Sequence, residues 1–225
     1  NEKEYSKYIN NEHELAIDER KVHMEENMII TISRQYGSGG SQVAKILAER
    51  MGVWCYDRDI LTIAAERIGN EELTEDTIND LNYKRNDVAS AGITGVMGMG
   101  NIPIYNQMFL EQAKIIRKLA NYGSAVFLGR CADYIFRDHR NVLNIYIYAP
   151  VDARYKNCVE VLKMKPEEAT KMIYKVDKAR TAYHKRYAKY APGDLDSKQI
   201  MIDSSVLGVK GTAEVLAEIV QRRFG

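Results

Sequence analysis

The segment from Met28 to Arg50, MIITISRQYGSGGSQVAKILAER, constrains the fold of this chain more than any other. It opens with a short apolar run rich in β-branched residues, which is typical of a strand buried on both faces. Gly37 to Gly40 interrupt that run. The residues after the glycines place an apolar stripe on one face of a helix, formed by Val43, Ala44, Leu47 and Ala48. The segment therefore predicts a strand, a tight loop and a helix, the usual start of a parallel α/β sheet.

The same alternation of short apolar runs and helical patterns continues along the chain. We predict strands at 28–33, 53–56, 125–129, 142–150 and 199–205, and helices at 59–68, 73–85, 107–121, 151–191 and 211–224. Within 151–191, Pro166 predicts the start of a helix. This pattern predicts an α/β fold of three layers, in which a parallel five-stranded sheet is flanked by helices. A length of 225 residues suits one such domain.

Composition limits the classes of partner. Charged residues make up 28% of the chain and the formal net charge is +1, so no overall basic field favours nucleic acid. The three cysteines, Cys55, Cys131 and Cys158, form no CxxC pair, which argues against a disulfide framework and a zinc site. We expect a cytoplasmic protein without a nucleic-acid partner.

Two segments need separate consideration. Residues 1–27 are highly charged and predict a helical extension that lies on the domain surface or forms a homodimer; no secretory signal is expected there. Residues 88–110 are long and uncharged, but their glycines, proline and amides make a membrane span a poor interpretation. We expect no contact with a membrane, and a long loop in this region.

The glycine loop is a partial match to a phosphate-binding motif. In the frame G-x-x-x-x-G-K-[ST], Gly39 and Ser41 match, whereas Arg34 replaces the first glycine and Gly40 replaces the lysine. The setting is stronger than the motif, because the amino end of a helix supplies free N–H groups and a favourable dipole for an anion. Two alternatives stay open: a structural turn, and a dinucleotide site using Gly37, Gly39 and Asp57, although Gln42 stands where its third glycine belongs.

Five stretches in this order resemble the cytidylate kinase-like family of P-loop nucleoside monophosphate kinases: ISRQYGSGG, CYDRDIL, FLGRCADYI, DKARTAYHKRY and MIDSSVLG. The resemblance covers about residues 28–225. It implies a P-loop NTPase-type fold with an acceptor-binding lobe at about 57–106 and a lid at about 151–192. It also implies transfer of the ATP γ-phosphoryl group, with Mg²⁺, to a nucleoside monophosphate such as CMP or dCMP.

The resemblance assigns the donor side of the reaction to the loop. On this template the amides of Gly37, Ser38, Gly39, Gly40 and Ser41 bind the phosphates, and the Ser41 hydroxyl is the Mg²⁺ ligand. Arg34 is the candidate for part of the charge that the absent lysine would carry. The alternative is an arginine that only pairs with a neighbouring acid.

Other charged residues are assigned to the acceptor and the lid. Arg130 would grip the acceptor phosphate, or form a structural ion pair. Family members commonly have an aspartate directly after this arginine; here Cys131 follows, and Asp133 lies two positions further on. Asp57 would orient the acceptor ribose or a magnesium-bound water, or cap the following helix.

The basic helical region carries the residues of the lid. Arg180 would reach the transferring phosphoryl group, Arg186 a neighbouring phosphate, and Asp177 would support Arg180 from the previous helical turn. A solvated basic helix is the alternative. Two other functions also stay open at this point: a nucleotide-binding module without catalytic activity, and a kinase of another small molecule.

Overall fold

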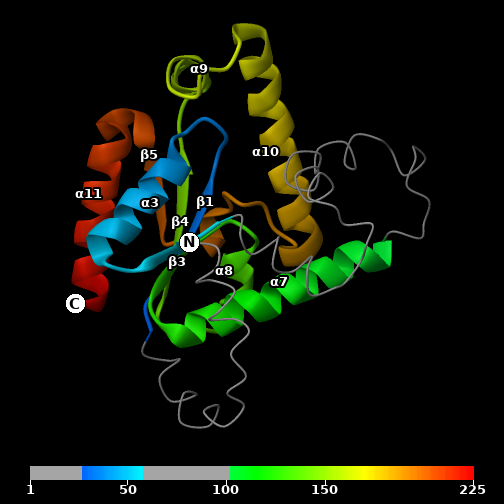
Figure 1. The fold of residues 1–225 in the computed structure, drawn as a ribbon, viewed down its shortest axis with the longest axis vertical. Coiled ribbons are helices and arrows are strands. Elements are labelled where there is room, and N and C mark those ends of the chain that lie inside the picture. Colours follow the sequence, from blue (N-terminus) through cyan, green and yellow to red (C-terminus); the bar gives the residue numbers. More distant parts are fainter. Residues whose placement is uncertain (1–26, 58–101) are drawn as a thin grey trace, which may run out of the picture.

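A computed structural model of the protein describes residues 27–57 and 102–225 (Figure 1). A five-stranded parallel sheet forms its centre, with the strand order β2-β3-β1-β4-β5. The strands are β1 (Ile29–Arg34), β2 (Trp54–Tyr56), β3 (Ala125–Leu128), β4 (Val142–Tyr148) and β5 (Ile200–Asp203). All of the strands point the same way, so their carboxyl ends meet at one edge of the sheet.

Helices connect the strands and cover both faces of the sheet. They are α3 (Gly40–Met51), α7 (Ile102–Tyr122), α8 (Ala132–Ile135), α9 (Val151–Glu160), α10 (Pro166–Ala188) and α11 (Ser204–Phe224), with a short 3-10 helix, η3 (Leu195–Ser197). In Figure 1, α3 and α11 flank one side of the sheet and α7 and α8 the other, while α9 and α10 extend beyond its carboxyl edge.

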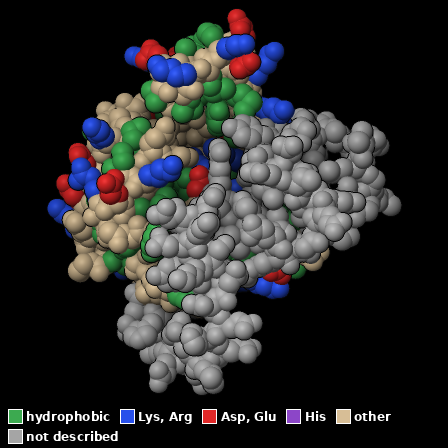
Figure 2. Space-filling view, in the orientation of Figure 1, with side chains coloured by type: hydrophobic (Ala, Val, Ile, Leu, Met, Phe, Trp, Pro, Cys, Tyr) green, Lys and Arg blue, Asp and Glu red, His purple; other side chains and the backbone are tan. Residues whose placement is uncertain are grey.

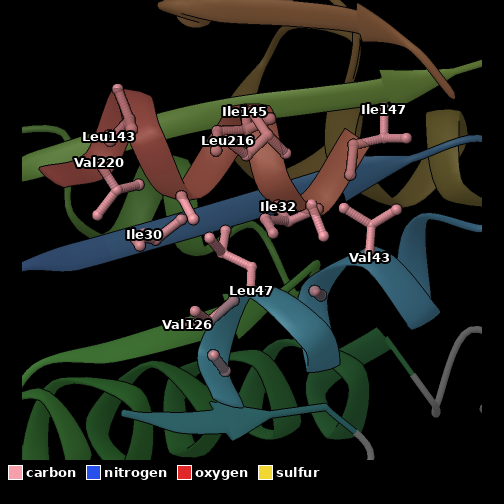
Figure 3. Packing of buried hydrophobic residues seen from close by; sticks show 14 of the residues in the cluster. Ile30, Ile32, Val43, Leu47, Val126, Leu143, Ile145, Ile147, Leu216 and Val220 are labelled. Carbon is pink, nitrogen blue, oxygen red and sulfur yellow. The ribbon is translucent and has the colours of Figure 1, made fainter. Parts of the chain in front are cut away.

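Two hydrophobic cores hold the three layers together. Alternate residues of β1 point to opposite faces, so Ile30 and Ile32 pack against α3 and α11, whereas Ile29 packs against α7 and α8. Figure 3 shows the core between the sheet and helices α3 and α11, to which Leu47 of α3 and Leu216 of α11 both contribute. Burial on both faces explains why the strands appear as continuous apolar runs in the sequence.

The predicted parallel sheet and its five strands are confirmed. The stripe predicted on the first helix is also confirmed, since all four of its residues are buried. Helix α7 starts at Ile102 instead of 107, so the end of the segment expected to be a loop is helical. Helix α11 starts at Ser204 and is kinked at Gly208, and α8 was not predicted.

Some predictions fall outside the described residues. The helices at 59–68 and 73–85, the N-terminal extension and most of the acceptor-binding lobe belong to this group. Within the described ranges, no helix has the length and apolar character needed to cross a bilayer. Figure 2 shows acidic and basic side chains interspersed over the described part of one face, as expected from the near-neutral charge of the chain.

Candidate active site

A cleft of about 1080 Å³ opens at the carboxyl edge of the sheet. Residues that follow β1, β2 and β3 form its floor, and one face of α10 forms a wall. Its described lining includes the predicted residues Arg34, Gly37, Gly39, Gly40, Ser41, Asp57, Arg130 and Arg180. Side chains assigned separately from the sequence are therefore brought together by the topology.

The glycine loop leads from β1 into the amino end of α3. Gly39 and Gly40 begin the helix, and Ser41 lies in its first turn facing the cleft. Ser38 is 5% exposed and lies beneath the loop, where its hydroxyl donates to the Gln35 carbonyl oxygen at 2.9 Å. Ser204 supports the loop from α11, because its hydroxyl donates to the Ser38 carbonyl oxygen at 2.6 Å. The side chain of Ser38 thus stabilises the loop, while the helix end presents the cleft with N–H groups.

Gly40 leaves the space that Arg34 occupies. A Cβ atom on residue 40 would lie 2.7 Å from Cβ of Arg34 and 3.0 Å from its Cγ, distances too short for ordinary contact. A lysine at this position would therefore collide with the arginine at its first side-chain carbon. The absence of a lysine at position 40 and the presence of Arg34 at the end of β1 are therefore linked, because the arginine side chain occupies the space that a lysine would need.

The Arg34 side chain extends along the carboxyl edge of the sheet toward β3 and β2. Its Nη1 lies 2.7 Å from the position of a Cβ on Gly129, and its Nη2 lies 3.5 Å from Oδ1 of Asp57. The ion pair expected under the alternative interpretation is therefore present. Both partners also line the cleft, with side chains 13% and 26% exposed, so the pair forms part of its charged floor.

Arg130 sits in a turn with unusual backbone geometry. Gly129, Arg130 and Cys131 have φ values of 75°, 61° and 54°, all in the left-handed region. This conformation costs an ordinary residue about 1–2 kcal/mol, and such strain is concentrated at functional sites. The turn holds Arg130 at the cleft although the residue is only 8% exposed.

Asp133 is the centre of a buried polar network. Its carboxylate is 1% exposed and accepts a hydrogen bond of 2.6 Å from Nζ of Lys198, which is itself fully buried. Nε2 of His184 lies 3.0 Å from Oδ1, and the Tyr190 hydroxyl donates to Oδ2 at 3.3 Å. Burial by itself raises the pKa of Asp133, but hydrogen bonds and charges from His184 and Lys198 outweigh it and lower the pKa to about 2.

This network joins three parts of the fold that are distant in the sequence. Asp133 belongs to α8 and His184 to α10, and Lys198 lies between η3 and β5. Nδ1 of His184 lies 2.9 Å from the Tyr190 carbonyl oxygen, so both ring nitrogens face oxygen atoms. Burial, and the charge of Asp133, raise the pKa of Tyr190. The network therefore ties the carboxyl-terminal part of α10 to α8 and to the segment before β5.

Asp177 binds the glycine loop. Its Oδ1 accepts a hydrogen bond of 2.7 Å from the Tyr36 N–H, and its Oδ2 accepts one of 2.5 Å from Nη1 of Arg154. Arg180, one turn further along α10, donates from Nη1 to the carbonyl oxygen of Arg34 at 3.0 Å. Asp177 and Arg180 thus both contact the segment from Arg34 to Tyr36, and direct support of Arg180 by Asp177 stays a prediction.

Comparison with known protein families identifies the family of this chain. A family model described as the cytidylate kinase-like family matches residues 29–206. The chain belongs to this family. Its parallel sheet, with a glycine loop between β1 and α3, is the P-loop kinase fold expected from the resemblance.

Two solved structures have a similar fold. An uncharacterized protein from Eubacterium ventriosum ATCC 27560 is 26% identical, with a TM-score of 0.63, over 86% of this chain and 98% of that one. TT1252 from Thermus thermophilus is 16% identical, with a TM-score of 0.54, over 89% of this chain and 99% of that one, and shows similarity of fold. A comparison with curated proteins gave no match.

Arg186 does not line the cleft with Arg34, Arg130 and Arg180. It is exposed near the end of α10, outside the described lining of the cleft, and its Nη2 donates to Oδ1 of Asn106 at 3.4 Å. It lies two positions after His184, which turns toward the interior. Helical spacing therefore directs the two side chains to different faces, and the predicted contact of Arg186 with a phosphate stays a prediction.

Sequence reasoning missed several residues that hold the site. Arg154 and Asn157 of α9 both bind the glycine loop, and Lys198 completes the buried network. Arg154 and Asn157 lie in the segment predicted as a basic helical lid. Polar and charged residues in such a segment are usually exposed to solvent. Their partners in the glycine loop are backbone atoms of residues about 120 positions away, and no local sequence pattern indicates such a contact.

Proposed function

We propose that this chain is an ATP-dependent phosphotransferase acting on a nucleoside monophosphate, with CMP or dCMP as the first acceptors to test. The observation that carries the proposal is the Arg34 side chain, which crosses Gly40 and brings a guanidinium to the floor of the cleft. A P-loop without its lysine then still has a cation beside its amides.

The residues of the cleft fit a nucleotide with Mg²⁺. Binding sites for small molecules usually measure about 300–1000 Å³, and this cleft has room for a nucleotide and a second substrate. The end of α3 supplies N–H donors for phosphates, and the Ser41 hydroxyl would be a protein ligand of Mg²⁺. The described residues contain no cluster of three or more acidic, histidine or cysteine side chains for a metal, so phosphate oxygens and water would complete the shell. Bound Mg²⁺ would neutralise phosphate charge.

The arginines have distinct roles in this proposal. Arg180 reaches the loop from α10 and would neutralise charge on the transferring group. Arg130 would hold the acceptor phosphate in line with the donor, because its guanidinium can make two parallel hydrogen bonds. Arg34 would supply positive charge on the floor of the cleft, where its guanidinium extends from β1 toward β3 and β2.

A coupled assay for ADP tests the proposal. Purified protein is incubated with ATP, Mg²⁺ and each of a panel of nucleoside monophosphates, and the rate is compared with the ATPase background. We expect a clear excess with at least one acceptor, led by CMP or dCMP. An ADP rate equal to the background with every monophosphate would overturn the proposal, and a panel of small hydroxylated acceptors would then test the broader kinase assignment.

A binding module without catalytic activity is the second candidate. The observation that favours it is the ion pair between Arg34 and Asp57, which engages the cation that replaces lysine. Isothermal titration calorimetry separates the two functions. Tight ATP binding that no acceptor alters, together with no turnover, would support the module.

A further inference from the structure

We propose that Arg154, Asn157 and Asp177 are positioning residues that set the conformation of the phosphate loop. The inference rests on the proposed function in one respect, because it assumes that this loop binds phosphate. It concerns how the loop acquires its shape: α9 and α10 hold it by its backbone.

Both polar groups of the Tyr36 backbone are held by one ion pair. The N–H of Tyr36 donates to Asp177 at 2.7 Å, and its carbonyl oxygen accepts from Nη1 of Arg154 at 3.3 Å. The same Nη1 donates to Oδ2 of Asp177 at 2.5 Å. The Arg154 side chain is 6% exposed and that of Asp177 is 25% exposed, so water competes little for these contacts.

The next residue of the loop is held by α9. Nδ2 of Asn157 donates to the Gly37 carbonyl oxygen at 2.8 Å. Gly37 has a φ of 78°, and a Cβ there would lie 2.8 Å from the Arg154 carbonyl oxygen and 2.9 Å from Sγ of Cys158. The loop therefore lies directly on α9, with two consecutive carbonyl groups bound to side chains of that helix.

These contacts bear on anion binding because a carbonyl oxygen facing a phosphate would repel it. An anion-binding loop needs successive N–H groups turned toward the ligand. Arg154 and Asn157 keep the carbonyl groups of Tyr36 and Gly37 engaged with α9. At the start of α3, which lines the cleft, the Gly40 N–H donates to the Ser38 hydroxyl at 3.3 Å, so the loop itself also orients this group. The charge on Asp177 holds Arg154 in place.

The same contacts couple the loop to Arg180. Asp177 and Arg180 lie one turn apart on α10, and each binds the backbone of the segment from Arg34 to Tyr36. A displacement of α10 would release the Tyr36 N–H and withdraw the Arg180 guanidinium together. The two helices thus act as a support for the loop as well as a wall of the cleft.

The test is binding of inorganic tripolyphosphate, which probes the loop without a base or an acceptor. Wild-type protein and the variants Asp177→Asn and Asn157→Ala are titrated by calorimetry. Asp177→Asn removes the charge that holds Arg154, and we expect Kd to rise about 10- to 100-fold, as for loss of a charge-assisted hydrogen bond. Asn157→Ala removes one neutral bond and leaves no buried charge, so its Kd should rise about threefold. Lys178→Gln, an exposed neighbour on α10, should bind as the wild type does.

A spectroscopic measurement separates positioning from general loss of structure. In protein labelled with ¹⁵N-glycine, tripolyphosphate should shift the amide resonances of Gly37, Gly39 and Gly40 in the wild type. In the variants these three resonances should differ before ligand is added, while that of Gly123, which has no neighbour around its Cβ position, stays unchanged. Changes spread equally over all glycines would indicate a structural role and overturn the proposal.

The outcomes distinguish this inference from the proposed function. Folded variants that bind tripolyphosphate as tightly as the wild type would overturn the positioning role. If Asp177→Asn does not fold, Asn157→Ala decides in the same way. A wild-type protein that binds no tripolyphosphate would contradict the phosphate loop itself, and with it the proposed function, before any variant is compared.

Discussion

Arg34 and Gly40 share one space at the carboxyl end of β1, since a Cβ on residue 40 would lie 2.7 Å from Cβ of Arg34. The two residues are six positions apart in the sequence, and the loop between them folds back so that the arginine passes over the glycine. In a standard P-loop a lysine occupies the position of Gly40. Here its space and part of its charge belong to the residue that ends the strand.

This relationship predicts that Gly40→Lys will not restore an ordinary P-loop. The new side chain would displace Arg34, and overpacking of this kind costs about 1–3 kcal/mol. We expect lower thermal stability and weaker ATP binding, measured by calorimetry. Combining Gly40→Lys with Arg34→Gly should recover binding, because the Cβ and Cγ atoms of residue 34 that cause the collision are removed and one cation remains.

Gly123→Ala is the matched control for this experiment. A Cβ on Gly123 meets nothing within 4 Å, so the substitution should leave stability and ATP binding unchanged. If Gly40→Lys bound ATP as well as the wild type and were equally stable, the interpretation of the shared space would be wrong.

Replacement of Arg34 tests its role in catalysis directly. Arg34→Met removes the cation at the floor of the cleft, and loss of one group that stabilises a transition state typically lowers kcat by about 100- to 1000-fold. The measurement is kcat with the best acceptor found in the panel. Arg50→Met is the control, since Arg50 is an exposed arginine of α3 that pairs with Glu214. A similar fall in kcat for both variants would refute a specific role for Arg34.

The network around Asp133 predicts a large loss of stability for Asp133→Asn. The amide would leave Lys198 buried without its carboxylate, and breaking a buried ion pair costs about 3–5 kcal/mol. Asp138→Asn, at a side chain that is 86% exposed, should change the free energy of unfolding by less than about 0.5 kcal/mol. Chemical denaturation of the two variants makes the comparison; equal stability would show that the network does not stabilise the fold.

Stability should also depend on pH through Asp133. Its pKa is lowered from 3.8 to about 2 in the folded protein, so the folded state favours the carboxylate. The associated stability, about 2 kcal/mol, is present above pH 4 and is lost as the pH falls toward 2. Unfolding measured between pH 5 and 2 should show this loss in the wild type, and less of it in a folded Asp133→Asn variant. Equal slopes in the two proteins would assign the acid sensitivity to other groups.

The cysteines should differ in reactivity. Cys158 is fully buried and burial raises the pKa of its thiol, so less thiolate is available at any pH. Cys55 is half-buried and lines the cleft. We expect iodoacetamide to label Cys55 first in the native protein and Cys158 only after unfolding, as located by peptide mass spectrometry. Bound ATP should slow the first reaction; rapid native labelling of Cys158 would contradict the packing of α9 against the loop.

Much of the fold could be predicted, because the sequence patterns that indicate its strands and helices span only a few neighbouring residues. The run from Ile29 to Ile32 has an apolar and β-branched character that suits a strand buried on both faces, and the stripe from Val43 to Ala48 repeats at helical spacing. The same reasoning found the helix beginning at Pro166, because proline is favoured in the first helical turn. It missed α8, which has only four residues and offers no periodicity to detect.

The sequence by itself determined the sheet, the loop and most residue types that line the cleft, because strand burial, helix periodicity and glycine turns are written over a few neighbouring positions. Only the tertiary structure decided what each charged side chain contacts. Arg34 crosses Gly40, Asp177 holds Tyr36, and Asp133 joins Lys198. These partners meet because parallel strands bring their carboxyl ends to one edge and helices return over it, a consequence of topology that no local pattern encodes.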